Sequence, residues 1–60
     1  MMMRHLHYTI TFDMRTKKFF VEVKGDGLAN GYTNHLLDTA EEFEALYNEY
    51  KSAGFLLTEE

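Results

Sequence analysis

Two consecutive stretches of alternating apolar and polar residues constrain the fold of this chain most. In the first stretch, apolar side chains occupy every second position: Leu6, Tyr8, Ile10, Phe12 and Met14. In the second stretch, residues 19–24, apolar side chains again occupy every second position: Phe19, Val21 and Val23. A period of two is typical of half-buried β-strands. The sequence therefore predicts a β-hairpin.

The register of this hairpin depends on the length of its loop. A four-residue loop over residues 15–18 would pair Met14 with Phe19, Phe12 with Val21, and Ile10 with Val23. A two-residue loop over residues 15–16 would also keep the apolar faces together, because it shifts the pairing by two positions. We prefer the longer loop, since Arg-Thr lacks the Gly or Asn that tight hairpin turns require.

The rest of the chain predicts a turn, a third strand and a helix. The segment GDGLANG, residues 25–31, supplies the glycines that turns with positive φ need, and YTNHLL, residues 32–37, follows it as a strand. Thr39 and Glu42 match the S/T-x-x-E capping box that begins a helix. Gly54 is placed to end the helix in the left-handed conformation, with Phe55 contacting Tyr50. FLLT, residues 55–58, would add a short fourth strand.

These elements predict an α+β fold in which one helix packs on one face of a small antiparallel sheet. We expect three antiparallel strands before the helix, a short fourth strand after it, and a single domain over residues 1–60. A chain of 60 residues builds only a small core. The expected core residues are Leu6, Tyr8, Ile10, Phe12, Phe19, Val21, Val23, Phe43, Leu46, Tyr47 and Tyr50.

Composition bounds the cellular setting. The chain contains no Cys, so disulfides are excluded and a reducing compartment is favoured. No apolar run approaches the roughly 20 residues of a membrane span, and the N-terminal residues lack the long apolar region of a signal peptide. We expect a cytoplasmic protein without a membrane partner.

The sequence carries no motif for catalysis or for a cofactor. Ser52 is the only Ser and no Cys is present, so an activated nucleophile is not indicated. His5 and His7 would lie on one face of the first strand, which is a metal-ligand spacing that His35 could complete. We prefer the interpretation that these histidines face solvent. The expectation is a protein that is not an enzyme and binds neither a metal nor a cofactor.

Charge is distributed unevenly along the chain. Residues 1–37 contain five basic and three acidic side chains, whereas residues 38–60 contain one basic and seven acidic side chains, within a net charge of −4. We call one exposed line of residues on the expected helix the acidic ridge: Glu41, Glu44 and Asn48, flanked by Glu42 and Glu49. The ridge is either a solvated helix face or a docking face for a basic surface of a protein partner. We favour a non-catalytic interaction module, such as a small inhibitor or adaptor.

A DNA-binding module is the alternative. The hairpin tip would present Arg15, Lys17 and Lys18 beside Phe20 to phosphates and bases. The segments DMRTKKFFVEV and LLDTAEEFEAL resemble the arm-binding domains at the N-terminus of tyrosine integrases, over residues 8–50. That resemblance implies a three-stranded sheet that inserts into the major groove, and RTKKF matches the place where the first turn leads into the second strand. The net charge of −4 and the few basic residues facing outward disfavour nucleic acid as the partner.

Two further expectations concern partners. In size and charge the chain is similar to small bacteriophage proteins that take over or inhibit host proteins, which implies a protein target. The sheet face opposite the helix would carry Phe20 among Thr and His side chains, so we also expect a weak homodimer. A self-assembling structural protein is the third functional interpretation.

Overall fold

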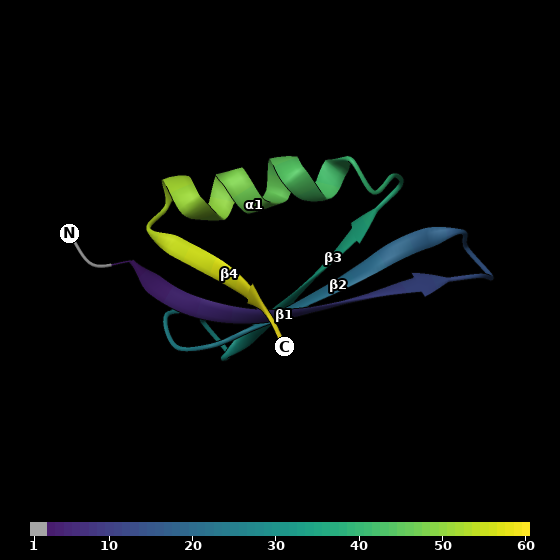
Figure 1. Cartoon of the computed structure of the whole chain (residues 1–60). Coiled ribbons are helices and arrows are strands. Elements are labelled where there is room, and N and C mark those ends of the chain that lie inside the picture. The colour runs from purple at the N-terminus through teal and green to yellow at the C-terminus, as the bar shows by residue number, and fades with distance from the viewer. Residues whose placement is uncertain (1–2) are drawn as a thin grey trace.

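Four strands and one helix form the part of the chain that this computed structural model describes, residues 3–60 (Figure 1). The elements are β1 (Arg4–Asp13), β2 (Lys18–Lys24), β3 (Tyr32–Leu37), α1 (Glu42–Ser52) and β4 (Phe55–Glu59). The strands form one sheet in the order β3-β2-β1-β4. The predicted α+β fold with three antiparallel strands is confirmed. The fourth strand is also present, and it runs parallel to β1 because α1 carries the chain back across the sheet.

The β1–β2 hairpin has the predicted facing but a different register. Ile10 pairs with Val21, and Phe12 pairs with Phe19. The preferred pairing of Met14 with Phe19 is therefore wrong, and the register is the one that the two-residue alternative implied. Because the two registers differ by two positions, the same apolar residues share one face in both.

The hairpin loop nevertheless contains four residues, 14–17, between the paired residues Asp13 and Lys18. The carboxylate of Asp13 accepts a hydrogen bond of 2.9 Å from the backbone N–H of Arg15. Lys17 adopts the left-handed conformation at φ 58° and donates its N–H to the carbonyl of Asp13 at 2.7 Å. These two contacts close the loop without Gly or Asn, which explains why turn composition misled the choice of register.

The fully buried core is smaller than the sequence predicted. It consists of five aliphatic residues on the sheet face beneath the helix: Leu6, Val21, Val23, Leu37 and Leu57. Aromatic residues from the sheet and the helix are half-buried around it, among them Tyr8, Phe19, Phe43, Tyr47 and Tyr50. The prediction that Ile10 and Phe12 lie in the core is wrong, since their side chains are 38% and 47% exposed.

A mismatch in length explains this exposure. The 11 residues of α1 span about 16 Å, whereas the 10 residues of β1 span about 33 Å. The helix therefore covers only part of the strand, and the far end of the β1–β2 hairpin projects past it (Figure 1). Ile10, Phe12 and Met14 lie on that projecting part.

The helix begins differently from the prediction and ends as predicted. No side chain caps its first turn, so the capping box of Thr39 and Glu42 is not formed. The backbone N–H of Glu42 instead bonds the carbonyl of Thr39 at 3.2 Å, which tightens the entry into the helix. At the other end Gly54 has a φ of 95°, and the rings of Tyr50 and Phe55 meet edge to face at 6.2 Å.

Candidate functional site

The apolar face of α1 holds the helix on the sheet and directs the acidic ridge away from it. The ring of Phe43 packs on Tyr8 with a centroid distance of 4.9 Å, and Tyr50 contacts Phe55 of β4. Leu46 and Tyr47 complete the half-buried stripe. Residues on the opposite side of an α-helix must then face solvent. The sheet thus fixes which side of the helix a partner would meet.

All five residues of the acidic ridge are exposed: Glu41, Glu42, Glu44, Asn48 and Glu49. Glu41, Glu44 and Asn48 follow one another along the side of the helix opposite Phe43, as their spacing of three and four residues predicts. Within residues 3–60 the ion pairs are Lys18–Asp38 and Lys24–Glu22, and neither includes a ridge residue. The ridge carboxylates therefore present uncompensated negative charge to solvent.

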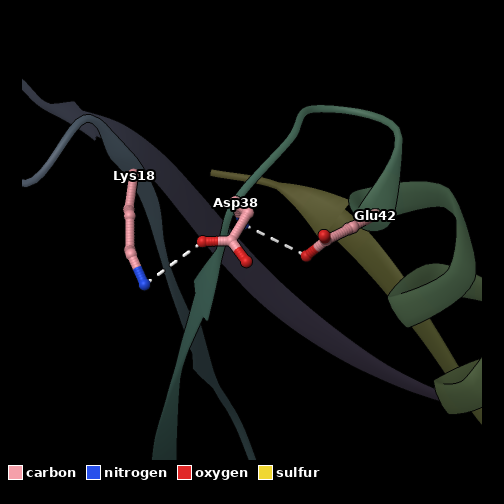
Figure 2. Close-up of polar contacts among 3 residues, drawn as sticks. All are labelled: Lys18, Asp38 and Glu42. Carbon is pink, nitrogen blue, oxygen red and sulfur yellow. Dashed lines mark hydrogen bonds and ion pairs between the residues drawn. The ribbon is translucent and has the colours of Figure 1, made fainter.

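Glu42 differs from the other ridge residues because its carboxylate has a structural contact (Figure 2). It accepts a hydrogen bond of 3.1 Å from the backbone N–H of Asp38, just before the helix. The carboxylate of Asp38 in turn lies 3.2 Å from the ammonium of Lys18 at the start of β2. This chain of contacts ties the entrance of α1 to the sheet. Glu41, Glu44 and Glu49 are consequently the ridge positions whose charge can be changed without removing this contact.

The candidate nucleic-acid residues lie in the hairpin loop and on β2, where carboxylates are close to the lysines of the strand. Arg15 and Lys17 are exposed in the hairpin loop, while Phe20 lies on the sheet face opposite the helix and is 37% exposed. The ammonium of Lys18 is paired with Asp38. On the same outer face Lys24 lies 3.4 Å from Glu22. Carboxylates thus accompany both lysines of β2, which weakens the attraction that a phosphate backbone would feel.

The three histidines do not converge on a metal site. His5 and His7 lie on the outer face of β1, and their cross-strand partners are Leu56, Thr58 and Lys24. His35 pairs with the buried Val21 and therefore lies on the opposite face, beneath the helix. The suggestion that His35 could complete a site with the other two is wrong. No group of three potential metal-ligating residues occurs within residues 3–60.

His35 contributes instead to a polar contact that the sequence did not predict. Its Nε2 atom lies 2.8 Å from the hydroxyl of Tyr50, and the two rings meet edge to face. Burial, with a smaller contribution from the negative charge of Glu49, raises the pKa of Tyr50 above its ordinary value. These residues line a shallow groove of about 290 Å³ at the C-terminal end of α1. The inward facing of His35 follows from its pairing with Val21, and the sequence of β3 alone carries no signal for it.

Comparisons with known proteins identify no relative: no family model, no curated protein and no solved structure matches this chain. Among the residues that the structure describes, no helix is both long and apolar enough to cross a membrane.

Proposed function

We propose that this chain is a non-catalytic interaction module that binds a basic surface of a protein partner through the acidic ridge. The observation that carries the proposal is the segregation of charge on α1. The helix directs its aromatic side chains to the sheet, while Glu41, Glu44 and Glu49 are exposed and form none of the ion pairs of residues 3–60. An uncompensated carboxylate ridge on a small scaffold attracts cationic surfaces from a distance and accelerates their association.

The physical basis of binding also sets its salt dependence. At an ionic strength of 0.15 M, charges separated by more than about 8 Å are largely screened. Attraction to the exposed ridge should therefore act mainly on the association rate, which should decrease steeply as salt is added. An inhibitor or adaptor would then act by occupying a basic surface that serves another ligand of the partner.

The test uses charge reversal with a matched control. The immobilised chain captures binding proteins from a lysate of its source cells, and the captured partner is purified and measured by surface plasmon resonance. The double variant Glu41→Lys/Glu44→Lys should lose binding while its melting temperature stays close to that of the parent. The control Glu59→Lys/Glu60→Lys produces the same change in net charge at exposed C-terminal positions and should retain most of the affinity.

The outcomes separate the competing functions. Unchanged partner affinity in Glu41→Lys/Glu44→Lys would contradict the proposal and leave the ridge as a solvated helix face. A DNA-binding module would behave differently in a gel-shift assay. There the same charge reversal would strengthen binding to duplex DNA, and Lys17→Ala/Lys18→Ala would weaken it.

A further inference from the structure

The edge of the sheet formed by β3 is open and uncharged. Among the described residues 3–60, β3 is the terminal strand of the sheet and pairs with β2 alone. Its sequence YTNHLL contains no Lys, Arg, Asp or Glu. Exposed edges normally carry charges, Pro or a bulge that prevent another strand from pairing with them. β3 contains neither a charged residue nor a Pro.

The register with β2 identifies the backbone groups that are free on this edge. The N–H of Gly25 bonds the carbonyl of Gly31 at 3.0 Å, so these opposed residues mark a bonding position at the start of the ladder, while the N–H of Gly31 bonds the carbonyl of Leu28 at 3.1 Å. Bonded and non-bonded pairs alternate in an antiparallel ladder. The β3 residues that bond β2 are therefore Thr33, His35 and Leu37. The backbone N–H and C=O groups directed away from β2 belong to Tyr32, Asn34 and Leu36.

Two of these residues, Tyr32 and Leu36, also carry exposed apolar side chains on the outer sheet face. Tyr32 is 54% exposed and Leu36 is 64% exposed. Phe20 lies directly opposite Leu36 on β2 and is 37% exposed. Backbone groups that need partners and apolar surface that gains from burial thus occur together at the β3 edge, on the side of the sheet away from α1.

We propose that a second copy of this chain pairs with the β3 edge in antiparallel orientation, on a two-fold axis that passes through Asn34. In this register Asn34 faces Asn34 of the other copy, and Tyr32 faces Leu36. The free backbone groups of Tyr32, Asn34 and Leu36 then bond their counterparts. On the outer face each Leu36 lies between Phe20 of its own chain and Tyr32 of the other. Aromatic and aliphatic side chains directly opposed across strands stabilise such pairing.

The charge distribution favours a second copy as the occupant. A two-fold axis brings each residue close to its own equivalent, so a charged edge would repel itself, whereas the β3 edge is neutral. The acidic helix packs on the sheet face that carries the buried core, so its ridge lies on the other side of the sheet from Tyr32 and Leu36 (Figure 1). The two acidic ridges of the dimer would therefore not enter the contact between the outer sheet faces. This inference does not depend on the proposed function of the ridge.

Asn34→Lys tests the proposal because its effect differs between the free chain and the dimer. In the free chain Asn34 is opposite Glu22, so a lysine there gains an attractive neighbour. In the dimer the substitution places like charges directly opposite each other at the axis. Sedimentation equilibrium should show that the parent dimerises and that this variant raises the dissociation constant at least about tenfold with its melting temperature retained. Mixing it with Asn34→Asp should restore dimers, because opposite charges then meet.

Cross-linking provides a second measurement that does not rely on repulsion. Because the chain lacks Cys, Asn34→Cys introduces a single thiol. Opposed residues of a bonded antiparallel pair have Cα atoms about 5.5 Å apart, a separation that a disulfide spans. Mild oxidation should cross-link this variant far faster than the control Thr58→Cys, which lies on the same sheet face at the β4 edge. Equal cross-linking rates, a parent that is strictly monomeric, or a dimer unaffected by Asn34→Lys would each overturn the proposal.

Discussion

The side chains of His35 and Tyr50 are joined by a hydrogen bond of 2.8 Å between Nε2 and the hydroxyl oxygen. The contact links the middle of β3 to the last turn of α1, and the two residues are separated by 15 positions in sequence. The packing of α1 otherwise depends on half-buried rings, since none of its residues is fully buried. A directional bond between the helix and the sheet therefore has more influence here than it would in a protein with a large core.

We predict a measurable coupling between these two residues. Tyr50→Phe and His35→Ala each remove one partner of the hydrogen bond, and such bonds contribute about 0.5–1.5 kcal/mol net to stability. The free energies of unfolding of both single variants and of the double variant, obtained by urea denaturation, form a double-mutant cycle. The interaction energy should fall in that range. Additive effects of the two substitutions would show that the bond does not stabilise the helix.

A second prediction concerns alkaline pH. Because burial raises the pKa of Tyr50 in the folded chain, its neutral phenol is favoured by folding. The corresponding stabilisation is complete below the unfolded pKa of 10.0 and is lost as the pH rises through the folded pKa. Melting temperatures from about pH 8 to about pH 11 should therefore fall more for the parent than for Tyr50→Phe. Titration of the other side chains is common to both proteins, so parallel curves would contradict the prediction.

Local patterns in the sequence predict where the strands and the helix lie, but they do not predict how these elements pair and pack. Alternation predicts β1 and β2 because one face of each strand is apolar, and Gly54 predicts the helix end because it adopts a positive φ. The hairpin register is not encoded in that alternation, since a shift of two residues leaves every side chain on its face. It depends on the hydrogen bond from Arg15 to Asp13 and on the left-handed Lys17, which are properties of the closed loop.

The candidate site shows the same division. The spacing of Phe43 and Tyr50 predicts which side of α1 packs on the sheet, and hence that Glu41 and Glu44 face solvent. The inward direction of His35 depends on the pairing of β3 with β2, which the sequence of β3 does not specify. The neutral β3 edge becomes recognisable only when the strand order places it at the end of the sheet.

Core substitutions should separate the true core from its exposed extension. Leu6 is fully buried beneath the helix, whereas Ile10 is 38% exposed on the projecting hairpin. Leu6→Ala should cost about 2–5 kcal/mol of unfolding free energy because it leaves a cavity. Ile10→Ala leaves a gap that water can enter and should cost clearly less. Chemical denaturation of both variants measures the difference. Equal losses of unfolding free energy would contradict the exposed position of Ile10 on the projecting hairpin.

A last prediction uses the glycines to separate backbone strain from steric overlap. Gly25 and Gly54 have φ values of 149° and 95°, so a side chain is strained at either position. Within residues 3–60 a Cβ at Gly54 would meet nothing within 4 Å, whereas a Cβ at Gly25 would lie 2.5 Å from Cδ2 of the buried Leu6. Gly54→Ala should therefore cost only the backbone strain, about 1–3 kcal/mol. Gly25→Ala should cost more, because Leu6 must move within the core.

The combination with Leu6→Ala identifies the source of the extra cost. Shortening Leu6 removes the atom that a Cβ at Gly25 would meet, so the double variant Gly25→Ala/Leu6→Ala should be more stable than the sum of the single effects implies. The pair Gly54→Ala/Leu6→Ala should be additive, since Gly54 has no such neighbour. Unfolding free energies of the two cycles in urea provide the comparison. Additivity in both cycles would show that the close approach of the β2–β3 loop to Leu6 does not constrain the core.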